Sequence, residues 1–202
     1  MEGMVPGPRR RLDPAARREQ ILQAAVAYFA EVGFGGPTRE LAQRCGITQA
    51  LLYKYFASKA ELAEAVFERI YLGRLDPDWM PALRDRSQPL EARLIRFYTQ
   101  YTDAIFTYEW MRIFMWSGLG SGALNQRYLG HVKQSLLEPL RREIGATPGL
   151  ATPTIEDMWN LHGGIVYIGI RRFIYQLPVP AQKRAAIRAA VRRFLGGLQH
   201  SG

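Results

Sequence analysis

A glycine between two short helical segments constrains this chain more than any other feature of its sequence. Gly46 stands where the chain must turn sharply, and we expect backbone of positive φ there, which glycine adopts without steric cost. The apolar residues around it recur at helical spacing and can bury against a preceding helix; they are Leu41, Ala42, Ile47, Leu52 and Phe56. Two helices joined in this way form a helix-turn-helix, whose second helix presents its outer face to a partner.

The segments around this turn complete a compact helical unit. Asp13 and Pro14 are typical of a helix start, because the carboxylate accepts from free amides and proline fits the first helical position. Thr48 can cap the helix after the turn, and Ser58 with Glu61 forms a capping box in which each side chain satisfies the other's backbone amide. We therefore expect three short helices followed by a longer fourth one.

Longer helices are predicted beyond this unit, and no segment shows the alternation of a strand. Residues 73–89 contain three prolines and mixed charges, which is typical of a linker. An apolar stripe predicts a helix over 90–108, and residues 110–116 are apolar nearly all round, which favours a buried helix. The remaining predicted helices are 124–144, which Pro139 kinks or interrupts, Ile155–Leu177 and Ala181–Gln199. The predicted fold class is all-α.

The outer face of the helix after the turn combines tyrosines with lysine, which neither a buried nor a purely solvated helix would carry. Its outward residues are Thr48, Gln49, Ala50, Tyr53, Lys54 and Tyr55. Small and polar residues lead the helix, where they would meet base edges, and hydroxyl and ammonium groups lie where phosphates would run. The net charge of +9 suits a polyanionic partner. A second interpretation is a three-helix core with a solvated face and no nucleic acid.

The same stretch resembles the tetracycline-repressor (TetR) family of transcriptional regulators over roughly residues 15–70. The matching positions span the end of the first helix, the turn and the start of the fourth helix; they are Phe29, Gly33, Phe34, Thr38, Ala42, Gly46, Ile47, Leu52, Tyr53, Phe56, Ser58, Lys59 and Leu62. Cys45 departs from the family pattern, in which a small residue such as alanine is common. The resemblance implies a helix-turn-helix DNA-binding domain over 13–72 and a helical domain over 73–202 that binds a ligand and dimerises. Residues 1–12 are rich in Gly, Pro and Arg with little to bury, which predicts a disordered basic arm.

The resemblance also implies roles for individual residues of the first domain. Thr38 and Tyr53 would hydrogen-bond phosphates, and Lys59 would hold a phosphate together with the free amides at the start of the fourth helix. The base-reading candidates are Arg39, Thr48, Gln49 and Lys54. Ala50 and Tyr55 complete the predicted DNA-binding set, and the alternative for Tyr55 is half-buried packing against the fourth helix.

Double-stranded DNA with an inverted repeat is the implied partner, bound by a homodimer. The last two predicted helices, Ile155–Leu177 and Ala181–Gln199, suit a four-helix bundle with a twin across a two-fold axis. Three glycines in the first of them indicate crowding, a cavity or simple tolerance; they are Gly163, Gly164 and Gly169.

Aromatic residues and methionines between 97 and 116 are candidates for an effector pocket, since ligand pockets are mostly apolar with a few polar groups. We expect a hydrophobic or amphipathic small molecule of unknown identity there. The candidate lining residues, with polar ones from elsewhere in the domain, are Tyr98, Tyr101, Trp110, Met111, Arg112, Met115, Trp116, His162 and Tyr167. Ordinary core packing is the alternative for most of them, and for His162 a satisfied core histidine is the commoner case.

Two groups of arginines have open interpretations. Seven basic residues and no acidic one follow Asp157, and Arg184, Arg188 and Arg192 share a helix face. That face is either solvated, paired with acids of another helix, or attractive to an anionic ligand. Arg9–Arg11 either follow the minor groove of DNA or form a tail with weak attraction for phosphate.

Enzymatic, metal and membrane functions find little support in the sequence. It has no GxSxG, P-loop or HExxH motif, and its three histidines are too scattered for a metal site, so we expect no cofactor, no metal and no catalysis. Cys45 is the single cysteine, the N-terminus does not resemble a signal peptide, and no apolar stretch reaches the ~20 residues that span a bilayer. A cytoplasmic location with no membrane partner is therefore expected.

These observations predict a homodimeric repressor of the TetR type that a small molecule releases from DNA. The alternative is a helical small-molecule-binding protein or enzyme with a vestigial DNA domain. A third interpretation is a regulator without a ligand, controlled by a protein partner or by its own abundance.

Overall fold

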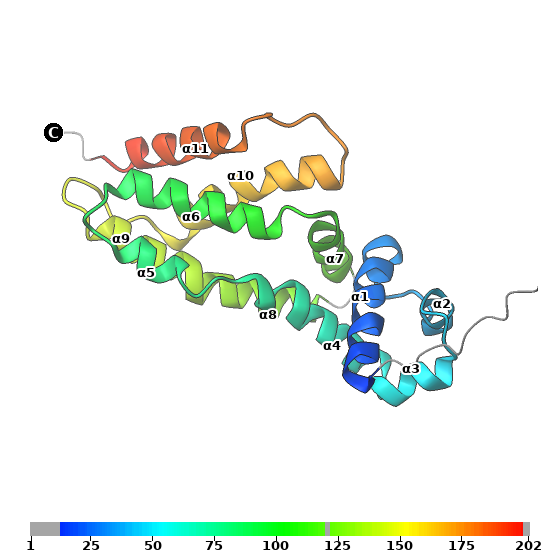
Figure 1. The fold of residues 1–202 in the computed structure, drawn as a ribbon. Coiled ribbons are helices and arrows are strands. Elements are labelled where there is room, and N and C mark those ends of the chain that lie inside the picture. The colour runs from blue at the N-terminus through cyan, green and yellow to red at the C-terminus, as the bar shows by residue number, and fades with distance from the viewer. Residues whose placement is uncertain (1–12, 120–121, 200–202) are drawn as a thin grey trace, which may run out of the picture.

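The computed structural model describes residues 13–119 and 122–199, which form helices joined by short loops (Figure 1). The predicted basic arm lies outside these residues. In chain order the elements are α1 (Pro14–Val32), α2 (Thr38–Arg44), α3 (Gln49–Tyr55), α4 (Lys59–Ile70), the 3-10 turn η1 (Leu72–Arg74), α5 (Trp79–Arg84), α6 (Leu90–Ile105), α7 (Tyr108–Leu119), α8 (Ala123–Val132), the π-helical segment η2 (Lys133–Leu137), α9 (Glu138–Gly145), α10 (Ile155–Phe173) and α11 (Lys183–Gly197). The described residues contain no sheet, and the predicted all-α fold class is confirmed.

Local capping fixes where three of the first four helices begin. Asp13 caps α1, Thr48 caps α3 and Ser58 caps α4, each through a side-chain oxygen that accepts from a first-turn amide, as predicted. The predicted capping box is half right. Ser58 Oγ accepts from the Glu61 amide at 3.0 Å, but the Glu61 carboxylate accepts from the amide of Ala57, at 2.7 Å, and not from that of Ser58.

The C-terminal helical domain is built on α6, α10 and α11, with α8 and α9 on the other side of α6 (Figure 1). α11 packs along α6 and buries Ile187 and Val191. The predicted helix over 124–144 is interrupted by η2, immediately before Pro139. Proline lacks an amide hydrogen and clashes with the carbonyl four residues earlier. The wider π turn, in which the Glu138 amide bonds to the Lys133 carbonyl, accommodates that clash.

Burial of α7 differs from the prediction. Trp110, Met111 and Ile113 point into the core, but Trp116 is 36% exposed and Leu119 is 77% exposed. The predicted stripe through Tyr108 also breaks, because α6 ends at Ile105 and a new helix begins at Tyr108. Helix α7 is therefore apolar nearly all round because one of its faces is buried in the core and another packs against α1, as described below.

The long helix α10 ends at Phe173, four residues before the predicted end. Pro178 disfavours helical backbone at the residue that precedes it. Gln176 takes a φ of 54°, and the Leu177 amide bonds back to the Arg171 carbonyl at 2.9 Å, which closes the helix.

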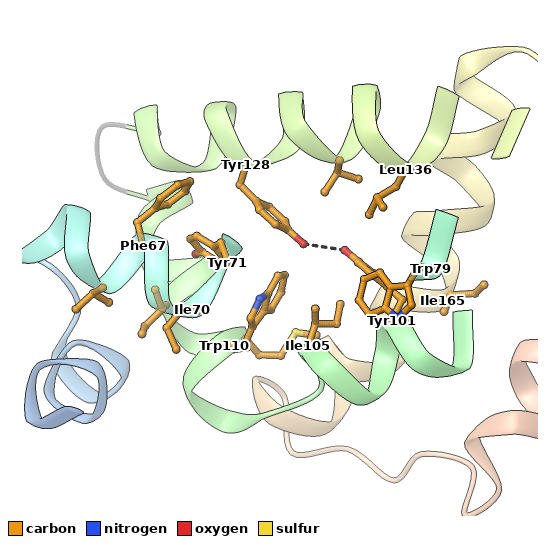
Figure 2. Close-up of a cluster of buried hydrophobic side chains, with 14 of the residues drawn as sticks. Phe67, Ile70, Tyr71, Trp79, Tyr101, Ile105, Trp110, Tyr128, Leu136 and Ile165 are labelled. Atoms are coloured by element: carbon orange, nitrogen blue, oxygen red, sulfur yellow. Dashed lines mark hydrogen bonds between the residues drawn. The ribbon is translucent and has the colours of Figure 1, made fainter. Parts of the chain in front are cut away.

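The hydrophobic core is continuous from the helix-turn-helix domain into the larger domain. Phe67 and Ile70 of α4 belong to the same buried cluster as Tyr71 and Trp110 (Figure 2). The predicted domain boundary between residues 72 and 73 falls within η1 and stays a prediction. No helix in the described part of the chain is long and apolar enough to cross a membrane.

Candidate nucleic-acid interface

The turn between α2 and α3 has the geometry that the sequence predicts. Gly46 has a φ of 64°, and a Cβ at this position would have no heavy atom within 4 Å. The backbone conformation, and not lack of space, therefore requires glycine here. Leu41, Ala42 and Leu52 are buried on the inner side of the two helices, which leaves the outer side of α3 free for a partner.

A hydrogen-bond network joins the first turn of α2 to α3. Thr38 Oγ1 lies 2.9 Å from the Tyr53 hydroxyl, and Gln49 Nε2 donates to Thr38 Oγ1 at 2.9 Å. Thr38 itself is only 6% exposed. One buried hydroxyl thus holds two exposed side chains of α3 in place, so Thr38 positions Tyr53 and Gln49 more than it presents its own oxygen.

The other predicted DNA-binding residues divide by exposure. Arg39, Thr48, Ala50 and Lys54 are exposed, as are Gln49 and Tyr53. Thr48 Oγ1 accepts the Leu51 amide at 3.1 Å as the α3 cap, so its hydroxyl hydrogen is the part left to donate. Tyr55 is half-buried against the core, which is the alternative that its sequence position allowed.

Lys59 lies at the first residue of α4 and reaches across to the loop before α2. Its Nζ donates to the Gly35 carbonyl at 3.0 Å. The free amides and positive dipole end of α4 lie at the same place, so an anion there would meet both a fixed charge and backbone donors.

Tyr28 is a positioning residue that the sequence interpretation missed. Its hydroxyl lies 3.1 Å from the Pro37 carbonyl, to which it donates, and 3.0 Å from the Glu40 carboxylate, so it ties α1 to the start of α2. Gly36 lets the chain pass this close, since a Cβ there would lie 2.6 Å from the Tyr28 hydroxyl. Tyr28 follows Ile21 by seven residues, a spacing of two helical turns that places both on the inner face of α1.

A buried polar cluster occupies the interior of the C-terminal domain. The hydroxyl of Tyr101 lies 2.8 Å from that of Tyr128 and 3.4 Å from His162 Nε2. Figure 2 shows the two hydroxyls pointing toward each other from facing helices, with Trp110 beside them. Among the described residues, the Tyr98 hydroxyl, Trp110 Nε1 and His162 Nδ1 are buried without a hydrogen-bond partner.

Burial also sets the charge of this cluster. It lowers the pKa of His162 to about 4. It raises the pKa of Tyr98 and of Tyr101, the latter against a lowering by the hydrogen bond from Tyr128. Both tyrosines and the histidine are therefore neutral at pH 7, and this cluster is polar but uncharged.

Arg112 and Trp116, which the sequence places among the effector candidates, contact α1 instead of the buried cluster. Arg112 Nε donates to the Ala30 carbonyl at 2.9 Å, and its Nη2 donates to the Glu31 carbonyl at 3.2 Å. Trp116 Nε1 donates to the Ala30 carbonyl at 3.3 Å. A guanidinium at these carbonyls complements the negative end of the α1 dipole. Helix α7 thus joins the two domains.

The remaining effector candidates lie in three places. Met111 is fully buried and packs on Gly169, where a Cβ would lie 2.5 Å from Met111 Cε, so this glycine marks crowding. Met115 lines a cavity of about 190 Å³ together with Arg112 and Trp116. Tyr167 is 49% exposed on α10 and does not join the cluster.

Comparison with known proteins shows which family the helix-turn-helix segment of this chain matches. Residues 21–66 match the model of the bacterial regulatory proteins of the tetR family. The HTH-type transcriptional repressor KstR2 of Mycolicibacterium smegmatis is 37% identical over 79 residues, which are 39% of this chain and 38% of the relative. The HTH-type transcriptional activator FasR of the same species is 37% identical over 92 residues, which are 44% and 42% of the two chains. The chain thus spans about two-fifths of the length of these curated relatives.

Solved structures share the fold over nearly the whole chain. The fatty acid degradation regulator FadR from Bacillus halodurans superposes with a TM-score of 0.70 at 15% identity, covering 95% of this chain and 100% of that one. A TetR family transcriptional regulator from Pseudomonas syringae superposes with a TM-score of 0.67 at 18% identity, with the same coverage. The helix-turn-helix segment, residues 21–66, thus matches the tetR family of bacterial regulatory proteins, and the chain as a whole shares the fold of these solved structures.

Proposed function

We propose that this protein is a homodimeric transcriptional regulator that binds an inverted repeat in double-stranded DNA through α3 and is released by a small molecule bound in its C-terminal domain. The observation that carries this proposal is the outer face of α3, where Tyr53 and Gln49 are held by the buried Thr38 hydroxyl. A preorganised polar surface on the second helix of a helix-turn-helix suits the major groove. We assign the protein no catalytic activity.

Each exposed residue of this surface takes a specific role. Tyr53 and Lys59 contact phosphates, and the first amides of α4 add to the site at Lys59. Arg39, Thr48, Gln49 and Lys54 read base edges, with Ala50 small enough to let α3 approach them. Gln49 must exchange its bond to Thr38 for one to a base, so its contribution to affinity is smaller than that of Arg39. Tyr55 supports α3 from the side of the core and leaves DNA contact to its neighbours.

Dimerisation through α10 and α11 brings two copies of α3 to one face of the DNA. Gly163 and Gly164 lie on an exposed side of α10 where a Cβ would meet nothing within 4 Å, which leaves room for a second chain. Two recognition helices about one helical turn apart, ~34–36 Å, or somewhat more, would then read the two halves of an inverted repeat.

The effector site is the buried polar cluster around Tyr98, Tyr101, Trp110 and His162. An unsatisfied buried donor costs about 1–3 kcal/mol, which a ligand that offers acceptors would recover. The tyrosines and the histidine are neutral at pH 7, so the ligand is uncharged where it meets them. Met111 can change shape to admit it. The ligand is thus a hydrophobic molecule with one or two hydrogen-bond acceptors.

Helix α7 couples this site to the DNA-binding domain. Its inner face carries Trp110 and Met111, and its outer face carries Arg112 and Trp116, which donate to the last carbonyls of α1. A ligand that shifts α7 would move α1 and with it the spacing of the two α3 helices. A difference of ~1–3 kcal/mol between the two states is enough to release DNA.

Repression is the proposed sign of regulation, as for the matched relative KstR2, while the matched relative FasR is an activator. The bound protein represses transcription when its site overlaps a promoter, and a ligand that releases it from DNA relieves that repression.

Selection of binding sites from random duplex DNA tests this proposal. The wild-type protein should enrich an inverted repeat, and Tyr53→Ala should enrich none. Tyr175→Ala is the matched control, because Tyr175 is 53% exposed on the far domain and its loss should leave the enriched sequence unchanged. No enrichment by the wild type, or an asymmetric motif, would refute the dimeric DNA-binding model.

A further inference from the structure

A groove runs between α6 and α11 and is not used by the proposed function. Two adjacent cavities form it, of about 380 and 440 Å³, and they share Ala92 and Arg184 in their walls. Cavities of this size fit small molecules and are too small to hold a folded partner. Helices α6 and α11, which carry most of its lining residues, lie away from α3 in the fold, so DNA bound by α3 would not cover them (Figure 1).

Arginines dominate the walls of this groove. Five arginines line the two cavities: Arg93, Arg96, Arg184, Arg188 and Arg192. The cavity walls hold two carboxylates, Asp85 in the first cavity and Glu91 in the second. The groove is therefore net positive, and its guanidinium groups suit oxyanions, which they bind through paired hydrogen bonds.

Two of the five arginines are already neutralised. Arg93 is buried and donates to Glu143 at 3.1 Å and to the Gln88 carbonyl at 3.1 Å. Arg192 Nε donates to Glu91 at 2.7 Å. With these two arginines paired, the other three arginines remain to bind a ligand in the open part of the groove.

Arg96, Arg184 and Arg188 have no ion-pair partner among the residues that the structure describes. Asp85 forms no ion pair with them: its Oδ1 accepts both the amide and the hydroxyl of Ser87, at 3.1 and 2.5 Å, although the charges of Arg93 and Arg96 contribute to the lowering of its pKa. Arg184 and Arg188 are four residues apart on α11, and like charges at this spacing destabilise a helix. An anion in the groove would relieve that repulsion.

Neutral donors line the first cavity beside the arginines. Thr99, Gln100 and Gln88 border it together with Arg96 and Arg184. The second cavity offers Arg188 and the apolar side chain of Ile95. The two halves thus differ: the first combines Arg96 and Arg184 with neutral donors, and the second combines Arg184 and Arg188 with an apolar wall.

We propose that this groove binds a small organic polyanion, with one oxyanion group between Arg96 and Arg184 and a second at Arg188. The ligand class is a multiply charged phosphate or carboxylate of small-molecule size, distinct from the uncharged ligand of the interior. By bridging α6 and α11 it would stabilise the position of α11, which is one of the two helices of the proposed dimer interface.

Isothermal titration of the full chain with pyrophosphate and with citrate tests this assignment, with sodium chloride holding the ionic strength constant. The wild type should bind one anion per chain, saturably. The double variant Arg96→Gln/Arg184→Gln should bind about tenfold or more weakly, since two charge-assisted contacts are lost. Arg188→Gln, a single change at an exposed residue, should also weaken binding and serves if the double variant does not fold.

Two control variants locate the bound anion. Arg193→Gln removes an exposed arginine of the same helix that lines neither cavity, and its affinity should equal that of the wild type. Lys54→Gln removes a lysine of the proposed DNA face and should also bind as the wild type does. No saturable binding by the wild type, equal weakening by Arg193→Gln, or loss of binding in Lys54→Gln alone would each overturn the proposal.

Discussion

Removing the hydroxyl of Tyr98 should make the protein more stable. This hydroxyl is buried on α6 and has no hydrogen-bond partner among the described residues, while its ring packs on Phe97 at 5.1 Å between centroids. An unsatisfied buried hydroxyl costs about 1–3 kcal/mol. Tyr98→Phe removes the oxygen and keeps the ring, so the free energy of unfolding should rise by about 1 kcal/mol or more. For a chain of this length, each 1 kcal/mol raises Tm by about 2–4 °C.

Tyr101→Phe is the matched control, because its hydroxyl does have partners. Its loss leaves Tyr128 without the bond at 2.8 Å, and the free energy of unfolding should fall by about 1–3 kcal/mol. Both variants are compared with the wild type by urea unfolding followed by circular dichroism, at one protomer concentration so that dimerisation does not shift the midpoint. A Tyr98→Phe variant that is destabilised as much as Tyr101→Phe would refute the reasoning, and with it the case for an effector site at these unpaired groups.

Four further predictions test the DNA contacts, the domain contact and the buried histidine. Lys59→Ala should weaken binding to all DNA sequences alike and lower the salt slope by about one; unchanged affinity in a salt titration would count against the phosphate role. Arg39→Ala should relax the preference at one base pair per half-site, at a cost of ~1–3 kcal/mol for the preferred base, and an unaltered selected motif would remove Arg39 from the base-reading set. Arg112→Met should lower the free energy of unfolding by about 1–2 kcal/mol and speed hydrogen exchange in the last turn of α1. The control Arg172→Met should change neither. Exchange in Arg112→Met that is as slow as in the wild type would show that α1 does not depend on this contact. His162 has a pKa of about 4 in the folded protein against an ordinary 6.5, so the unfolded chain takes up its proton first as pH falls. Stability that is fully present above pH 6.5 should be lost between 6.5 and about 4, by up to about 3 kcal/mol, and His162→Phe should remove this part of the pH dependence of unfolding.

Local signals predicted the helix-turn-helix domain well because its chemistry is local. Asp13, Thr48 and Ser58 each cap a helix within three residues of themselves, and Gly46 takes the positive φ that its place in the turn requires. The error at Glu61 is of one residue, since its carboxylate reaches the amide of Ala57. Spacing alone does not decide between two amides that lie side by side.

The larger domain was harder to predict because its side chains are placed by contacts between distant segments. The sequence predicts Arg112 as a polar group for a ligand, but its partners are carbonyls about eighty residues earlier in the chain, and no sequence pattern links the two. The exposure of Tyr167 could have been foreseen. It follows His162 by five residues, which at 3.6 residues per turn places it ~140° around α10 from that buried side chain.

At the end of α10 and before α9, the sequence predicts where the helix is interrupted but not the backbone conformation of the interruption. The prolines at 178 and 139 correctly predict that a helix is interrupted in both places. They do not predict the backbone conformation at each interruption. At the end of α10 this is a positive φ at Gln176, and before α9 it is a π turn in Lys133–Leu137. The form depends on which backbone groups can still find partners once the proline has removed one.

A hydroxyl-radical and methylation-interference footprint on the selected duplex tests the central claim most directly. The account predicts two symmetric sets of major-groove contacts, about one helical turn apart and on one face of the DNA, both absent with Tyr53→Ala. A single protected patch, contacts confined to the minor groove, or a footprint that survives Tyr53→Ala would contradict it.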